Sequence, residues 1–247
     1  ILLRPRVALS FKPGDLKFGS IIGIVLALGF ITQTLGLSLT TAATSGFLTG
    51  LYVVFTPLIA WLFTRKKFVT RVIIGVILAA AGLAIFSGTA TDVEFQIGQL
   101  WLVLCAVFFA IHILLLGAYG KGRSSYRMAM IQISFAAVTC WAFALADGYQ
   151  PPPNFEVWFA VLFTALLSTV IAFWVQTWAQ TLIDPARVAL LITSEVIFSA
   201  ALAVGLGQEP LTVAMVVGGG IMLTAMLIVE WPTQSEPEIP LEAKLHE

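Results

Sequence analysis

The feature that most constrains this chain is a series of long apolar segments that follow one another from residue 19 to residue 231. A helix needs about 20 residues to cross roughly 30 Å of hydrocarbon. Eight segments meet this requirement: 19–41, 42–64, 70–88, 97–120, 127–147, 154–181, 186–208 and 211–231. The runs are continuously apolar and lack the alternation of barrel strands, so we predict an all-α polytopic membrane protein with eight transmembrane helices.

Composition excludes several functional classes. The chain is 59% hydrophobic and 11% charged, whereas soluble domains carry about a quarter charged residues. Its net charge is zero, so nothing attracts it to nucleic acid. Its two histidines, His112 and His246, are too few and too far apart for a ligand cluster. We therefore expect no nucleic-acid partner, no metal, no cofactor and no catalytic residues.

Basic residues alternate from loop to loop along the chain. If the first loop is cytoplasmic, the cytoplasmic side receives all 13 Lys and Arg residues. These are Arg4, Arg6, Lys12, Lys17, Arg65, Lys66, Lys67, Arg71, Lys121, Arg123, Arg127, Arg187 and Lys244. The opposite loops hold only acids: Asp92, Glu94, Asp147, Glu156 and Glu209. The positive-inside rule then predicts a cytoplasmic C-terminus, with residues 232–247 as a polar cytoplasmic tail.

The chain also contains an internal repeat. Gln33-Thr34 recurs as Gln176-Thr177, an offset of 143 residues, and the same offset pairs residues along three consecutive segments. Lys66, in a basic loop, is paired with Glu209, in an acidic one, so the two copies have opposite orientations in the membrane. Inverted repeats of this kind are typical of secondary transporters, and each copy must contain an odd number of helices.

The repeat divides the chain into two units. The second repeat, 97–231, contains five helices, whereas the first, 1–96, contains the last three of five. Residue 1 is paired with Ala144, near the end of the second helix of copy two. We therefore expect an inverted-repeat helical bundle in which eight helices are present of an expected ten.

Two stretches resemble the EamA-type transporters of the drug/metabolite transporter superfamily. One is TSGFLTGLYVVFTPL, residues 44–58, and the other comprises SEVIF, 194–198, and GQEPLT, 207–212. The chain departs from the family at Glu195-Val196, where many members have Glu-Pro, and in lacking the first two family helices. The resemblance implies ten helices, alternating access, and transport of amino acids or related metabolites across the bacterial inner membrane, with export as the expected direction.

Glu195 is the strongest candidate for a functional residue. It lies near the middle of a predicted span, where an acidic side chain costs about 2.5–3.5 kcal/mol and should face protein or water. It could contact a substrate amine or couple transport to protons, or it could be a structural hydrogen-bonding group between helices. The same offset pairs Glu195 with Tyr52, so the two could face each other across the repeat axis.

Four further residues could line a central cavity. His112 lies within a predicted span, and a neutral His bonded to a neighbouring helix is the interpretation that we favour. The repeated Gln33 and Gln176 could line the cavity or bond helices together. Trp174 could form an aromatic cavity wall, although such residues more often face lipid or its interface.

The leading hypothesis is thus a transporter of small molecules, in contact with the lipid bilayer and either monomeric or homodimeric. A membrane-embedded enzyme is the alternative, but it would need a nucleophile with a base or paired acids near one face. A structural membrane subunit is a further alternative. A channel would carry a filter or a ring of charges, and the sequence shows neither.

Overall fold

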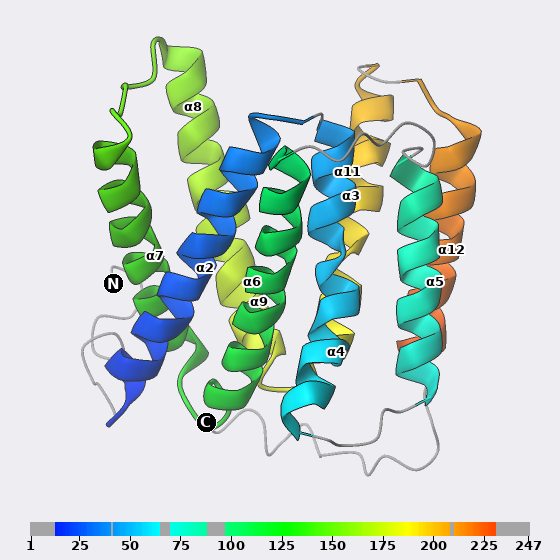
Figure 1. Cartoon of the computed structure of the whole chain (residues 1–247), viewed down its shortest axis with the longest axis horizontal. Helices are drawn as coiled ribbons and strands as arrows, with labels where there is room; N and C mark the ends of the chain where they lie inside the picture. Colours follow the sequence, from blue (N-terminus) through cyan, green and yellow to red (C-terminus); the bar gives the residue numbers. More distant parts are fainter. Residues whose placement is uncertain (1–12, 41, 65–69, 88–96, 208–209, 231–247) are drawn as a thin grey trace.

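The fold is that of a computed structural model, which describes residues 13–40, 42–64, 70–87, 97–207 and 210–230. All regular elements in these residues are helical (Figure 1). Labels follow Figure 1, in which the first described helix is α2. The helices are α2 (Asp15–Leu37), α3 (Ala42–Gly50), α4 (Tyr52–Thr64), α5 (Thr70–Ser87), α6 (Ile97–Tyr119), α7 (Ser125–Ala146), α8 (Phe155–Phe163), the π-helix η1 (Thr164–Ile171), α9 (Ala172–Ala179), α10 (Pro185–Ile192), α11 (Ser194–Gly205) and α12 (Val213–Glu230).

Local sequence explains where the helices begin. α2 begins four residues earlier than predicted, after Gly14, whose φ of 86° turns the chain into the helix. The side chains of Ser124 and Asn154 accept hydrogen bonds from the backbone amides of Arg127 and Val157 and so cap α7 and α8. Pro185 opens α10, although the preceding Asp184 makes no capping bond with its side chain.

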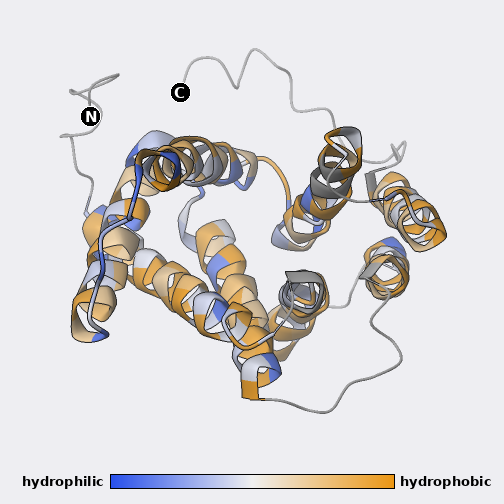
Figure 2. Cartoon of the chain, turned by 90° about the horizontal axis from the view of Figure 1, so that it is seen from above, coloured by the Kyte–Doolittle hydropathy of each residue, from blue (hydrophilic) through white to orange (hydrophobic). Residues whose placement is uncertain are grey.

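The polytopic membrane fold is confirmed. Five helical stretches among the described residues are long and apolar enough to cross a bilayer: Asp15–Leu37, Ser45–Phe63, Ile97–Tyr119, Ser125–Ala146 and Phe155–Ala179. Thr70–Phe86 and Val213–Val229 are shorter apolar helices. Hydrophobic residues cover most of the helical surface in Figure 2, and many large ones are exposed. Lipid is the solvent in which such a surface is stable.

Two predicted spans are interrupted near their middles. The span 42–64 is divided at Leu51 into α3 and α4, and the span 186–208 is divided at Thr193 into α10 (Pro185–Ile192) and α11 (Ser194–Gly205). At each break the backbone closes a tighter turn, since Leu51 N–H donates to the Leu48 carbonyl and Thr193 N–H to the Leu190 carbonyl. The departure from Glu-Pro at 195–196 therefore does not prevent a break in this helix.

The core of the bundle lies between helices that are distant in sequence. α2 packs along α6 and α7, α4 packs against α6 and α10, and α5 packs along α12. Figure 1 shows α5 and α12 side by side at one end of the molecule, with α7 and α8 at the other. The largest buried cluster joins α4, α5, α6, α10 and α12 through residues such as Val53, Ala79, Ala110, Leu190 and Ala225.

The contacts between α5 and α12 occur twice, once between a set of residues and once between their mates at the offset of 143. A Cβ on Gly75 would meet Val229 and the Ala225 carbonyl, and a Cβ on Gly218 would meet Phe86 and Gly82. Gly218, Phe86 and Gly82 are the repeat mates of Gly75, Val229 and Ala225. The early part of α5 meets the late part of α12, so the helices are antiparallel. A two-fold axis relating antiparallel helices is perpendicular to them, which is the geometry of an inverted repeat.

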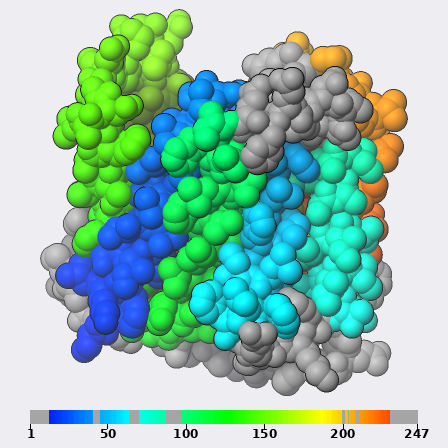
Figure 3. Space-filling model, in the orientation of Figure 1, coloured from blue at the N-terminus to red at the C-terminus, as the bar shows by residue number. Residues whose placement is uncertain are grey.

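The mate of α2 is packed very differently from α2. α2 buries nine residues, whereas α8 and η1 bury none. In Figure 3, α8 and the upper part of α7 project beyond the rest of the viewed face. The helices that cover α2 are α6 and α7, the first two of copy two.

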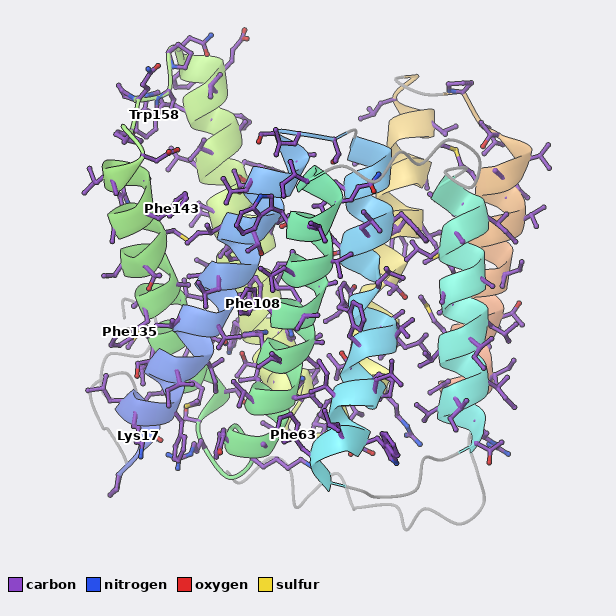
Figure 4. All side chains as sticks on the ribbon, in the orientation of Figure 1. Lys17, Phe63, Phe108, Phe135, Phe143 and Trp158 are labelled. Carbon is purple, nitrogen blue, oxygen red and sulfur yellow. The ribbon has the colours of Figure 1, made fainter. Side chains whose placement is uncertain are left out.

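Charged residues gather at one end of the described bundle. Figure 4 shows Lys17 at this end and Trp158 at the other. Asp15, at the start of α2, is fully buried and forms ion pairs with Arg123 and Arg127. Other charged residues used for the topology lie outside the described residues, namely Arg4, Arg6, Lys12, Arg65, Lys66, Lys67, Asp92, Glu94, Glu209 and the tail 232–247.

Candidate functional site

A cavity of about 190 Å³ lies within the bundle, between the two repeats. Its walls come from α2, α3 and α4, within residues 1–96, and from α6, η1, α9, α10 and α11, within residues 97–231. It is lined by Phe30, Gln33, Thr49, Tyr52, Phe109, His112, Ile113, Ser168, Phe173, Gln176, Ile192 and Glu195. The volume is below the roughly 300–1,000 Å³ of pockets that hold drug-sized ligands, so the cavity suits a small molecule.

Eight of these lining residues form four pairs at the repeat offset of 143. The pairs are Phe30 with Phe173, Gln33 with Gln176, Thr49 with Ile192, and Tyr52 with Glu195. Every lining residue of α2, α3 and α4 thus has its mate in the opposite wall. The paired part of the lining therefore lies where the two copies of the predicted repeat meet. Inverted-repeat transporters bind their substrates at such an interface.

The two helix breaks position Tyr52 and Glu195, the repeat-related pair whose side chains differ most in chemistry. Tyr52 is the first residue of α4, directly after the break at Leu51. Glu195 is the second residue of α11, two residues after the break at Thr193.

Tyr52 and Glu195 are buried to different extents. Tyr52 is 3% exposed, and its hydroxyl oxygen has no hydrogen-bond partner among the described residues. A buried hydroxyl that is left unpaired costs about 1–3 kcal/mol, so this group is available to a ligand. Glu195 is exposed and also lines the cavity. The site therefore presents one acidic group beside one unpaired phenol.

His112 is held by a chain of polar side chains that links three helices. Its Nε2 lies 2.8 Å from Gln132 Oε1 on α7, and Gln132 Nε2 donates to Thr177 Oγ1 on α9 at 2.8 Å. Thr177 in turn donates to the Phe173 carbonyl. Gln132 Oε1 can only accept, so His112 carries its proton on Nε2 and is held as one tautomer. This matches the structural interpretation of His112, which in addition lines the cavity.

Aromatic rings form the apolar part of the wall. The Phe30 ring packs edge-to-face with Phe109 at 5.7 Å and with Phe173 at 5.8 Å between centroids. Phe173 also packs edge-to-face with the His112 ring at 5.7 Å. Edge-to-face packing holds rings in defined orientations, so the wall is preorganised. The arrangement offers aromatic surface to the apolar part of a ligand.

The structure brings together five of the six residues proposed from sequence. Glu195, His112, Gln33, Gln176 and Tyr52 all line the cavity. Trp174 does not line it; its side chain is 44% exposed and packs edge-on against Tyr126.

Sequence reasoning did not select several other residues of the wall, chiefly Phe30, Phe109 and Thr49. Phe30 could have been found, because the repeat offset pairs it with Phe173, another aromatic residue. No pattern in the sequence singles out Phe109, which lies on α6.

Known proteins share both the sequence and the fold. The model of the EamA-like transporter family matches residues 1–88 and 96–231. An uncharacterized transporter of Archaeoglobus fulgidus is 32% identical over 218 residues, which cover 88% of this chain and 70% of that protein. A protein of known crystal structure, 15% identical, aligns with a TM-score of 0.69 over 93% of this chain and 91% of its own. At that identity the last similarity concerns the fold alone.

Proposed function

The chain belongs to the EamA-like transporter family, and from this premise we propose that it is a secondary transporter that moves small metabolites by alternating access. The proposed cargo is amino acids or related compounds, and the proposed direction is export. The observation that carries the proposal is the cavity lined by four repeat-related pairs. A site on the symmetry axis can be opened to either side by equivalent movements of the two repeats.

The helix breaks support this mechanism. Leu51 and Thr193 interrupt α3–α4 and α10–α11 at repeat-related positions to within one residue. Leu51 directly precedes Tyr52, and Thr193 lies two residues before Glu195. Short stretches of tighter helix often act as hinges. Hinges beside the site would allow each half-helix to tilt without disturbing the packing of α5 against α12.

Substrate counterflow in proteoliposomes tests the proposal. Vesicles that contain the protein and are preloaded with unlabelled amino acid should accumulate the labelled compound transiently and saturably. Flux that does not saturate would indicate a channel, and chemical conversion of the labelled compound would indicate an enzyme. Sidedness follows from comparing right-side-out with inverted membrane vesicles, in which an exporter concentrates its substrate only in the inverted ones.

The proposed location is the bacterial inner membrane, with a cytoplasmic C-terminus and a monomeric or homodimeric assembly. The distribution of basic residues supports the orientation, since Lys17, Lys121, Arg123 and Arg187 flank the same end of the helices. Light scattering of the purified protein, corrected for detergent, measures the assembly state.

A membrane-embedded enzyme is the second candidate because Ser168, His112 and Glu195 all line the cavity. A hydrolytic site would need the serine bonded to the histidine. Instead, Nε2 of His112 is engaged by Gln132, and the Ser168 hydroxyl is not bonded to it. The family and its transporter relative also point away from an enzyme.

A further inference from the structure

Among the residues that line the cavity, only Glu195 can carry a formal negative charge. Glu195 is the one carboxylate among the lining residues, and these residues include no Lys or Arg. The remaining polar groups are the neutral side chains of Gln33, Gln176, Thr49, Ser168 and Tyr52, together with His112. A ligand with a positive charge would thus find a counter-ion here, whereas a negative charge would face Glu195 without one.

Tyr52 provides a second polar group for a ligand that binds Glu195. The Tyr52 hydroxyl is buried and unpaired among the described residues, and it belongs to the position that the repeat pairs with Glu195. A phenol oxygen accepts a hydrogen bond, and a carboxylate accepts several. An ammonium group is a compact donor of up to three hydrogen bonds, so it can satisfy both residues at once.

The rest of the cavity suits an apolar body. Phe30, Phe109 and Phe173 form a continuous set of edge-to-face rings, and Ile113 and Ile192 complete the apolar lining. Aromatic faces attract cations as well as apolar groups. The small volume limits the ligand to about the size of one ring with a short chain.

We propose that the preferred substrate is a small amine cation, consisting of an ammonium group bound between Glu195 and Tyr52 and an apolar or aromatic body packed on Phe30, Phe109 and Phe173, and that it carries no carboxylate. The proposal rests on the transport function proposed above and specifies the class of its substrate. Among amino acids and related compounds, it selects the decarboxylated amines.

Four compounds that differ by one group test the assignment on the purified full chain by isothermal titration calorimetry at neutral pH. They are 2-phenylethylamine (a cation), phenylalanine (the same amine with a carboxylate), 3-phenylpropanoate (the carboxylate without the amine) and 2-phenylethanol (a neutral analogue). 2-Phenylethylamine should bind at least about tenfold more tightly than the other three, the scale of a hydrogen bond to a charged group. Equal or tighter binding of phenylalanine, or no binding of 2-phenylethylamine, overturns the assignment.

Substitutions of Glu195 and Tyr52 test whether these two residues bind the ammonium group. Glu195→Gln should weaken the binding of 2-phenylethylamine by about 10- to 100-fold and that of 2-phenylethanol far less, because only the charged ligand loses a counter-ion. Tyr52→Phe should weaken the binding of 2-phenylethylamine by a smaller factor than Glu195→Gln does. Glu156→Gln, an exposed acid in the first turn of α8, is the control and should bind like the parent protein. An unchanged affinity in Glu195→Gln overturns the proposal.

The outcome stays interpretable if Glu195→Gln does not fold, because the preference of the parent protein for 2-phenylethylamine over 2-phenylethanol needs no variant. Failure of the transport function is also distinguishable. If phenylalanine shows counterflow and 2-phenylethylamine neither binds nor exchanges, the protein is a transporter and the cation assignment is wrong. If 2-phenylethylamine binds as expected but no counterflow occurs, the site stands and the transport function fails.

Discussion

At the scale of single residues, buried polar groups decide which helices stay together. His112, Gln132 and Thr177 join α6, α7 and α9 through bonds of 2.8 Å between side chains. Asp15, at the start of α2, forms ion pairs with Arg123 and Arg127. These ion pairs lie at the end of the helical bundle where most of the described basic residues are found. In a surrounding where apolar packing alone cannot specify partners, such bonds are the specific contacts.

Gln132→Leu should lower the stability of the protein. The change removes both bonds of the amide and leaves the Nε2–H of His112 and the hydroxyl of Thr177 with fewer partners, at a cost of about 1–2 kcal/mol. Thermal unfolding in detergent measures the shift. The double variant His112→Leu/Gln132→Leu should lose less than the sum of the single variants; strict additivity would show that the two side chains are not coupled.

Asp15→Asn should destabilise the protein more strongly. Arg127 is 4% exposed, and removing the shared carboxylate charge leaves two cations close together with less compensation. Breaking a buried ion pair costs about 3–5 kcal/mol. Asp147→Asn is the control, since Asp147 is exposed at the end of α7. Equal melting temperatures for the two variants would contradict the structural role of Asp15.

At the scale of elements, glycines set the distance between α5 and α12. A Cβ on Gly218 would lie 2.5 Å from the Gly82 carbonyl oxygen and from the Phe86 amide nitrogen, both backbone atoms that cannot rotate away. The neighbouring Gly220 has nothing within 4 Å of the same position. Two glycines that are two residues apart in one helix thus differ in packing: Gly218 is in close contact with α5, and Gly220 is not.

Gly218→Ala should force α5 and α12 apart and destabilise the protein by about 1–3 kcal/mol. Gly220→Ala meets no neighbour and should be neutral or stabilising by up to about 1 kcal/mol, because Ala favours helix. Unfolding by heat or by a denaturing detergent compares the two. Equal losses in both variants would show that these helices do not make the close contact seen here.

At the scale of the whole molecule, the repeat accounts for the position of the cavity and for the asymmetry of the packing. α2 is covered by α6 and α7, whereas its mate, α8–η1–α9, buries Thr177 alone among its residues from 155 to 179. The four residue pairs of the cavity span both copies. The site is therefore a property of the assembled repeats and not of either repeat alone.

An impermeant thiol reagent tests the orientation in intact cells. With Cys105 and Cys140 replaced by Ala, a cysteine introduced at Gln150 should be labelled, whereas one at Lys121 should be protected until the cells are opened. Both positions are exposed, so packing does not limit the reagent. The reverse pattern would contradict the orientation inferred from the basic residues.

An experimental structure tests the symmetry. Residues 19–88 should superpose on 162–231 after rotation about an axis in the membrane plane, as the antiparallel contacts of α5 and α12 indicate. Superposition only about an axis along the membrane normal would mean that the repeat is parallel and that the two helices should not be antiparallel.

The sequence by itself determined the membrane fold and identified five of the residues that line the cavity, namely Gln33, Tyr52, His112, Gln176 and Glu195. Length and apolarity locate the helices, because a bilayer leaves the backbone no alternative to internal hydrogen bonds. The predicted spans agree with the helices to within a few residues, and differences such as the start at Asp15 arise where caps and turns matter more than apolarity. The repeat pointed to Gln33, Gln176, Tyr52 and Glu195, since a constant offset between related residues can be detected in the amino-acid sequence alone.

Only the tertiary structure decided which side of each helix faces the cavity. Phe173 and Trp174 are neighbours in sequence, yet Phe173 lines the cavity and Trp174 does not, because successive residues of a helix point about 100° apart. The bond from His112 to Gln132 and the unpaired hydroxyl of Tyr52 also depend on contacts between segments distant along the chain. In spans that are apolar all round, no periodicity marks the inner face, so packing alone assigns it.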